Sequence, residues 1–179
     1  AVHKELAPDG KPLINSVNGE ERYLEGILPL AAEYGAAVIG MTLDDDGIPP
    51  TPEDRLAVAR KILDRAKAQG LPPEDVVIDC MALSVSTDPD AGRVTLEAIH
   101  MVREELGVNM TLGPSNVSFG LPERENLDWA FTAMAIQHGV NCPIVNVSQD
   151  RRFIMGIDVI LGKDEQGLQF IQDYREREA

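Results

Sequence analysis

The chain has 179 residues, of which 44% are hydrophobic and 4% aromatic, so we expect one domain with an aliphatic core. Its formal net charge of −14 argues against a nucleic-acid partner, because a phosphate backbone is bound by clustered Lys and Arg. No apolar run reaches the about 18 residues of a membrane span and no signal peptide is visible, so we expect a cytoplasmic location and no membrane partner.

The cysteines and the acidic residues show no pattern typical of a metal site. Cys80 and Cys142 lie far apart inside apolar runs, without CxxC or Cys/His spacing. We interpret both as buried free thiols in a reducing compartment. Asp44, Asp45 and Asp46 form an acidic run that we interpret as a solvated turn, because no histidine or further carboxylate stands at a recognisable ligand spacing. We therefore expect no bound metal.

Strands and helices are predicted to alternate along the chain, and most helices end at a glycine. Residues 1–11 are typical of the tail of a helix followed by a turn. The apolar runs predict strands over 12–17, 36–43, 76–83, 108–112 and 142–147. Amphipathic spacing predicts helices over 19–34, 52–69, 91–106, 124–138, 152–161 and 165–174, the second of them capped by Thr51.

This alternation predicts a parallel sheet flanked by helices, since the strand starts lie about 30 residues apart, as in βαβ units. An open doubly wound sheet and a (β/α)8 barrel both fit the pattern. No GxGxxG follows any predicted strand, which disfavours a dinucleotide-binding sheet. A complete barrel needs about 200 residues or more. Either the sheet is open, or the chain is the larger part of a barrel whose first strands are absent.

Asp79 stands inside the apolar run VVIDCMAL. An unpaired carboxylate in such a strand is costly to bury, so it must meet a hydrogen-bond donor. A carboxylate accepts two parallel hydrogen bonds from an N–H/NH2 edge, such as the aminopyrimidinone edge of a pterin. A helix N-cap or an internal salt bridge would satisfy Asp79 as well.

Further polar residues follow the ends of apolar strands. Ser115 and Asn116 come after the fourth predicted strand, where its carboxyl end would present them to a ligand. A turn rich in Ser and Asn is the alternative. Asn15 lies at the polar end of the first predicted strand. Its alternative role is to cap the N-terminus of the next helix. Their amides donate and accept hydrogen bonds, which suits a heterocycle better than proton transfer.

For three other polar residues we favour structural roles. Asn146 lies on the fifth predicted strand, and His100 lies in a helical stripe. His138 stands at a helix C-terminus, where a cation interacts well with the helix dipole. The sequence also contains no Ser/His/Asp order and no GxSxG nucleophile elbow.

Five segments of the chain closely resemble, in order, the later part of the methyltetrahydrofolate:corrinoid methyltransferases: PLINSVNGE, AAVIGMTLDDDGIP, DVVIDCMALSVS, TLGPSNVSFGLPER and DVILGKDEQGLQFI. That family is similar to the folate-binding domain of cobalamin-dependent methionine synthase and is related to dihydropteroate synthase. The resemblance covers the chain from about Lys11 onward, and SNVSFGLP after a strand is rather specific. It implies a (β/α)8 TIM barrel of the pterin-binding type, with the pterin across the carboxyl ends of the strands.

Position by position, the resemblance implies a pterin site that includes Asp79, Asn15 and Asn116, to which we add Ser115. Asp79 matches the aspartate that pairs with the amino edge of the pterin, and Asn15 matches a pterin-contacting asparagine. Asn116 matches the asparagine that hydrogen-bonds near nitrogen 5 and is the implied catalytic residue. The implied reaction transfers a methyl group from nitrogen 5 of methyltetrahydrofolate to the cobalt of a cobalamin-type corrinoid. A neutral Asn116 can stabilise the protonated amine without competing for its proton.

By this alignment the chain begins within the third helix of the barrel. We therefore expect residues 1–179 to form a single pterin-binding domain, an incomplete barrel with strands 4 to 8 and their helices, inactive alone. The implied partners are a folate and a separate corrinoid protein or domain, and we expect a homodimer. One alternative is a dihydropteroate synthase-like enzyme, although PSNV stands where that reaction would want a Lys or Arg. Another is a non-catalytic folate-binding module of a larger protein.

Overall fold

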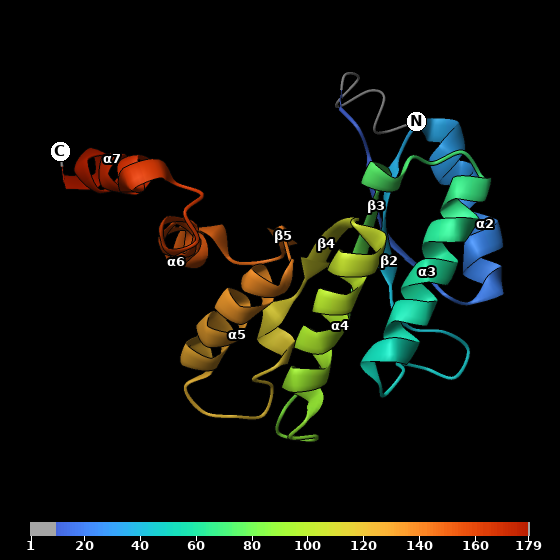
Figure 1. Ribbon diagram of the computed structural model, residues 1–179, viewed down its shortest axis with the longest axis horizontal. Helices are drawn as coiled ribbons and strands as arrows, with labels where there is room; N and C mark the ends of the chain where they lie inside the picture. The colour runs from blue at the N-terminus through green and yellow to red at the C-terminus, as the bar shows by residue number, and fades with distance from the viewer. Residues whose placement is uncertain (1–9, 179) are drawn as a thin grey trace.

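Strands and helices alternate through the part of the chain that the computed structural model describes, residues 10–178 (Figure 1). The strands are β1 (Leu13–Asn18), β2 (Ala37–Met41), β3 (Val76–Asp79), β4 (Asn109–Leu112) and β5 (Cys142–Pro143). The α-helices are α2 (Glu21–Tyr34), α3 (Pro52–Ala68), α4 (Ala91–Leu106), α5 (Arg124–His138), α6 (Val147–Ile160) and α7 (Leu168–Glu178). Short 3-10 helices are η1 (Pro73–Asp75), η2 (Pro114–Asn116) and η3 (Glu165–Gly167).

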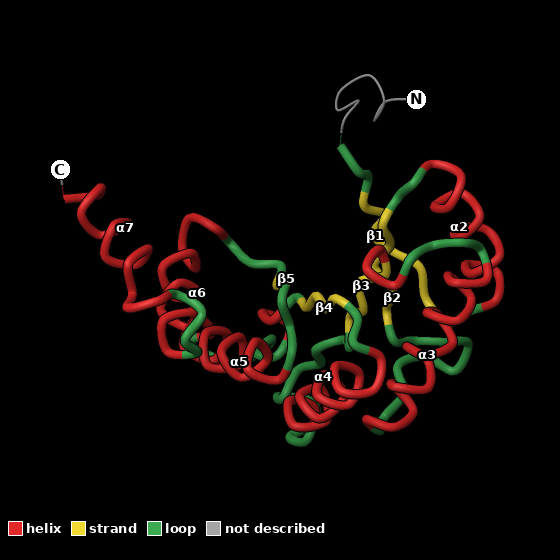
Figure 2. Tube along the Cα trace, turned by 45° about the horizontal axis from the view of Figure 1, so that its top comes forward, coloured by secondary structure: helices red, strands yellow, loops and turns green. Residues whose placement is uncertain are grey.

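The strands form one parallel sheet in the order β1-β2-β3-β4-β5. A doubly wound sheet reverses its strand order at a switch point, and the described strands contain no such reversal. The sheet is curved, and helices α2 to α5 lie along its outer side (Figure 2). The predicted α/β fold is therefore confirmed, and it is consistent with part of a TIM barrel of the pterin-binding type.

The two faces of the sheet differ because successive side chains of a strand point to opposite sides. On the outer face, Val76 and Ile78 are fully buried in the core against the helices. Gly40 lets α3 approach closely, since a Cβ atom there would lie 2.9 Å from Cγ2 of Ile62. The residues in between, such as Asp79, point to the inner face, which α2 to α5 leave uncovered (Figure 2).

Several helix boundaries follow the sequence pattern closely. Helices α4 and α5 span the predicted residues 91–106 and 124–138, and each ends at a glycine with positive φ. Thr51 caps α3 as predicted, because its hydroxyl accepts the main-chain N–H of Asp54 at 3.2 Å. Local signals were therefore sufficient at these helix ends.

The second, third and fifth predicted strands are too long at their carboxyl ends, whereas β4 ends at Leu112 as predicted and β1 runs one residue further, to Asn18. β3 ends at Asp79 rather than at residue 83, so Asp79 terminates the strand instead of lying in its middle. β5 covers two residues, because α6 begins at Val147 and the Asn146 side chain caps it by accepting the N–H of Ser148 at 3.2 Å. The last helix starts at Leu168, after a 3-10 turn, and runs beyond the predicted end.

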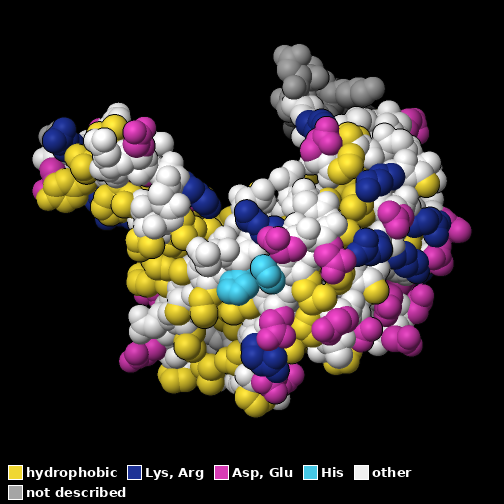
Figure 3. Space-filling view, in the orientation of Figure 1, with side chains coloured by type: hydrophobic (Ala, Val, Ile, Leu, Met, Phe, Trp, Pro, Cys, Tyr) yellow, Lys and Arg dark blue, Asp and Glu magenta, His cyan; other side chains and the backbone are white. Residues whose placement is uncertain are grey.

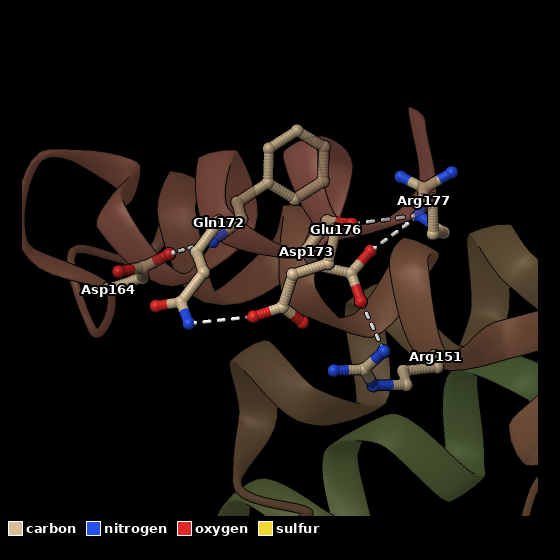
Figure 4. A network of polar contacts seen from close by, with 7 residues as sticks. Arg151, Asp164, Gln172, Asp173, Glu176 and Arg177 are labelled. Carbon is tan, nitrogen blue, oxygen red and sulfur yellow. Dashed lines mark hydrogen bonds and ion pairs between the residues drawn. The ribbon is translucent and has the colours of Figure 1, made fainter. Parts of the chain in front are cut away.

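Helices α6 and α7 extend past β5 and are joined by a polar network (Figures 1 and 4). Asp173 of α7 is 6% exposed and accepts hydrogen bonds from Arg151 of α6 and Arg177 of α7. Asp164 accepts two main-chain N–H groups at the start of α7, at 3.1 and 2.9 Å. Figure 3 shows the surface hollowed between α7 and the end of the sheet that carries β1.

The two cysteines differ in exposure. Cys80 is buried, as predicted, but Cys142 is exposed, so the prediction of its burial is wrong. Cys142 lies in β5, which pairs only with β4 among the described strands and stands at the uncovered face. An apolar run in the sequence therefore did not guarantee burial at the edge of the sheet.

The predicted helix tail at the beginning of the chain lies outside the described residues, which begin at residue 10. Of the predicted turn that follows it, only residue 10 is described. Between residues 10 and 178, every helix is too short or too polar to cross a lipid bilayer.

Candidate functional site

One row of residues crosses the sheet at the carboxyl ends of its strands. Asp79 pairs in register with Met41 of β2 and with Thr111 of β4, and the row continues to Asn18 and Cys142. Register partners point to the same face, so this row lies on the inner face. In barrel-type α/β proteins the ligand binds at this edge, which makes the row the candidate site.

Asp79 is partly buried at this edge and has one engaged oxygen. Its Oδ1 accepts the main-chain N–H of Met81 at 2.8 Å. Its Oδ2 makes no hydrogen bond with residues 10–178, and Asp79 forms no salt bridge and caps no helix within that range. Burial raises the pKa of the Asp79 carboxyl, and the hydrogen bond from Met81 offsets part of that rise. Perturbed carboxyls of this kind are typical of functional sites.

The η2 turn after β4 carries Ser115 and Asn116, and both residues are exposed. Arg124, at the start of α5, holds this loop from the outside. Its Nε donates to Oγ of Ser118 at 2.9 Å and its Nη2 donates to the Ser115 carbonyl at 2.6 Å. The Asn116 amide makes no side-chain hydrogen bond with the described part of the chain, so it is available to a ligand.

The loop after β3 is tied to the loop after β4. The N–H of Val85 donates to the Val117 carbonyl at 3.0 Å. The hydroxyls of Ser84 and Ser86 both donate to the Phe119 carbonyl, at 2.6 and 2.8 Å. The loop that follows Asp79 and the loop that carries Asn116 are therefore joined by hydrogen bonds at one edge of the sheet.

Asn15 lies deeper in the sheet than predicted. It pairs with Ile39, two residues before the level of Asp79, and β1 is two strands from β3, a separation of about 10 Å. Asn15 is exposed at the inner face, just before a register shift that ends at Val17. Its alternative role as an N-cap is wrong, because α2 begins after Glu20.

Asn18, and not Asn15, stands at the polar end of β1 and at the level of Asp79. Its Oδ1 accepts the main-chain N–H of Glu20 at 3.0 Å, and its Nδ2 donates to Oε1 of Glu20 at 2.9 Å. The Asn18 amide is therefore already engaged in the turn that starts α2, which leaves Asn15 as the more available asparagine of this strand.

Arg55 of α3 lies behind the site and was missed by sequence reasoning. It is 1% exposed, and its Nη1 donates to the carbonyls of Cys80 and Met81 at 3.0 and 3.1 Å. The signal is present in the sequence, because Arg55 stands four residues before Ala59 in the apolar stripe of this helix. A charged residue within such a stripe indicates a buried polar partner.

A cavity of about 500 Å³ lies next to this edge, between α5 and α6. Ser115 lines it, whereas the other predicted site residues do not. The Trp129 and Phe153 rings stack in its wall, with centroids 5.5 Å apart, and Nε1 of Trp129 donates to Asp150 at 2.9 Å. Ser115 therefore lies at the rim of this aromatic cavity, in the turn that directly follows β4.

The two histidines of the helices and the acidic run after β2 lie apart from the row. The His100 and His138 rings meet edge to face, with centroids 6.1 Å apart, on α4 and α5. Asp44 accepts the N–H of Asp46 at 3.1 Å within a tight turn. Over residues 10–178, no group of three or more His, Cys, Asp or Glu side chains is placed to hold a metal ion.

Comparison with known proteins relates these features to pterin enzymes. The sequence model described as pterin binding enzyme matches residues 1–146. The chain is 29% identical over 169 residues to a methylcorrinoid:tetrahydrofolate methyltransferase of Eubacterium limosum, covering 92% of this chain and 62% of that protein. It is 33% and 30% identical, over 153 residues each, to the methionine synthases of Mycobacterium leprae (strain TN) and Mycobacterium tuberculosis (strain ATCC 25618 / H37Rv). Those two matches cover 78% of this chain and 13% of each synthase.

A curved parallel sheet with polar side chains at its carboxyl edge is consistent with part of an α/β barrel, and proteins of that class bind their ligands at this edge. The chain spans less than two thirds of the length of these relatives. It belongs to the family of pterin binding enzymes, whose sequence model matches more than half of its residues. The resemblance identified from the sequence is thereby confirmed.

Proposed function

We propose that this chain binds the pterin of a folate at the carboxyl edge of its sheet and serves as a methyltransferase. In this proposal a methyl group passes from nitrogen 5 of methyltetrahydrofolate to the cobalt of a corrinoid that a separate protein or domain carries. The name of the Eubacterium limosum relative describes the reverse transfer. Both directions pass through the same transition state, so one site serves both.

The position of Asp79 is the observation that carries this proposal. Its carboxylate ends β3 on the uncovered face, with Oδ1 held by Met81 and Oδ2 facing no donor among residues 10–178. A pterin presents a ring N–H beside an amino group, and such an edge matches a carboxylate. Ligand donors would also compensate the burial that raises the pKa of this carboxyl.

Asn116 is the proposed catalytic residue. The methyl group leaves nitrogen 5 without its bonding electron pair, which stays on the nitrogen, so the amine departs readily only after protonation. The cobalt of the reduced corrinoid supplies the electron pair for the new bond to carbon. Asn116, exposed and neutral, can accept a hydrogen bond from the protonated nitrogen and so stabilise the protonated form, which becomes a neutral amine as the methyl group leaves.

Asn15 and Ser115 complete the proposed binding site from either side of Asp79. Asn15 reaches the inner face from β1, and Ser115 precedes Asn116 in the η2 turn. A reaction of the dihydropteroate synthase type is supported less well, because Arg124 is directed into its own loop. The expectations of a homodimer and of a cytoplasmic location stay predictions.

Calorimetry with methyltetrahydrofolate tests this proposal. We expect the chain to bind the folate and the Asp79→Ala variant to bind at least about tenfold more weakly, since it loses a charge-assisted hydrogen bond of about 1.5–3 kcal/mol. Asp45→Ala is the matched control, because Asp45 is an exposed carboxylate in the loop that follows β2. Equal heats from the chain and from Asp79→Ala would overturn the assignment of the pterin site. Binding without methyl transfer to a supplied corrinoid protein would instead favour a folate-binding module.

A further inference from the structure

Arg55 is a buried cation that forms no salt bridge with residues 10–178. Its guanidinium donates four hydrogen bonds, all to neutral oxygens: Nε to the Pro49 carbonyl at 2.9 Å, and Nη1 to the carbonyls of Cys80 and Met81 and to Oγ1 of Thr95, at 3.0, 3.1 and 3.0 Å. Burying a charge costs desolvation free energy, which the hydrogen bonds of the buried group must compensate. Two of the four reach the two residues that directly follow Asp79.

Met81 needs such support because its backbone is strained. Its φ of 62° lies in the left-handed region, which a side chain other than glycine adopts at a cost of about 1–3 kcal/mol. The residue is held from both sides: its carbonyl accepts from Arg55, and its N–H donates to Oδ1 of Asp79 at 2.8 Å. Strain of this kind persists only where the surroundings fix it.

We propose that Arg55 is a positioning residue for Asp79. By holding the Cys80 and Met81 carbonyls, it keeps the Met81 N–H directed at Oδ1 and so turns Oδ2 toward the inner face. This proposal rests on the proposed function, because Asp79 is taken to bind the pterin. A lysine at position 55 keeps the charge, but it cannot reproduce the planar fork that reaches several acceptors at once.

The test compares Arg55→Lys with Arg60→Lys, which makes the same change at an exposed arginine of α3 that pairs with Glu105. Without ligand, we expect the Met81 amide to exchange with solvent hydrogen at least about tenfold faster in Arg55→Lys. Amides in the middle of α5 should exchange at the same rate in both variants. An unchanged rate at Met81 would overturn the proposal, and this readout is independent of folate binding.

The second measurement is a double-mutant cycle on methyltetrahydrofolate affinity. Arg55→Lys should weaken binding about tenfold in the native chain and by less than about twofold in the Asp79→Asn background, because the residue acts through that carboxylate. Additive losses would show a general structural role and overturn the proposal. Absence of folate binding in the native chain would overturn the proposed function instead.

A milder variant covers the case in which Arg55→Lys does not fold. Thr95→Val keeps the shape of the side chain but removes one acceptor of the Arg55 guanidinium, together with a hydroxyl placed to donate to the Met81 carbonyl at 3.3 Å. We expect it to speed exchange at Met81 by a smaller factor and in the same direction. No change at Met81 in a folded Thr95→Val chain would count against the proposal.

Discussion

Asp79 and Thr111 are register partners on neighbouring strands, yet their side chains are satisfied to different degrees. Oγ1 of Thr111 donates to the Cys142 carbonyl at 2.7 Å, and the residue is 2% exposed. Asp79, at the same level of the sheet, has one carboxylate oxygen without a partner among the described residues. The row is therefore closed by internal hydrogen bonds at β4 and open to a ligand at β3.

The first prediction concerns the stability of Asp79→Asn. Burial raises the pKa of Asp79 above its ordinary value of 3.8, so the folded chain holds this proton more tightly than the unfolded chain does. Stability due to this group is then largest below the ordinary value and falls as pH rises through the folded pKa. We expect Asp79→Asn, which keeps an acceptor for the Met81 N–H, to be more stable than the native chain at pH 7.

Urea unfolding at several pH values measures this difference. The advantage of Asp79→Asn should shrink as the pH falls through the folded pKa and vanish below about pH 4, where the aspartate is protonated in both states. A native chain that is the more stable one at pH 7 would contradict the prediction. Residues that are kept for binding often lower the free energy of unfolding of the free protein, and Asp79 would be one of them.

The second prediction separates two asparagines. In an assembly that transfers the methyl group, Asn116→Ala should lower the rate by about 100-fold, as expected for loss of a preorganised hydrogen-bond partner of the protonated nitrogen, with little change in the free energy of unfolding. Asn146→Ala is the control, because it removes the cap of α6 and should lower stability by about 1 kcal/mol without a comparable effect on transfer. Spectroscopic assay of methyl transfer to a reduced corrinoid, beside thermal unfolding, distinguishes them. The assignment fails if both variants transfer at the same rate.

The third prediction concerns the contact between β2 and α3. A Cβ atom at Gly40 would lie 2.9 Å from Cγ2 of Ile62 and 3.1 Å from Cδ1 of Ile78, so Gly40→Ala should lower the free energy of unfolding by about 1–3 kcal/mol. Gly26→Ala, in an open position on α2, should raise it by about 0.5–1 kcal/mol. Chemical denaturation of both variants checks the opposite signs. A Gly40→Ala chain as stable as the native one would show that this packing is looser than the structure indicates.

The fourth prediction concerns the attachment of α7. Asp173→Ala removes the carboxylate that accepts from Arg151 and Arg177 (Figure 4), and loss of such hydrogen bonds should weaken the docking of α7 by about 1.5–3 kcal/mol. Hydrogen exchange should then accelerate in α7 while the strands stay protected. Glu178→Ala, at an exposed acid of the same helix, should leave the exchange unchanged. Equal exchange of α7 in all three chains would rule out this role for Asp173.

Much of the fold was predictable because it is encoded locally. Gly107 and Gly139 end α4 and α5 where the amphipathic pattern stops, and Thr51 supplies the cap of α3. The last strand was not predictable in this way. The run CPIVNV is apolar enough for a strand, but Asn146 caps a helix there and β5 keeps two residues.

The candidate site was predictable in its residue types and less so in its geometry. Asp79 is visible as a charge within an apolar run, and the structure places it at the end of a strand. Asn15 stands two residues before the level of Asp79, and the register shift that follows it brings Asn18 to that level, which no side-chain pattern announces. Arg55 is visible as a charge within the apolar stripe of α3, but the main-chain carbonyls that it contacts leave no motif in a sequence.

The unequal exposure of the two thiols has a practical consequence. Cys80 is buried, and burial raises its pKa, so it resists alkylation, whereas Cys142 is open to reagents. A maleimide fluorophore should therefore attach to one position per chain. That position shares its sheet level with the proposed folate-binding aspartate, two strands away, so the emission of the dye would give a direct optical signal of occupancy in the unmutated protein.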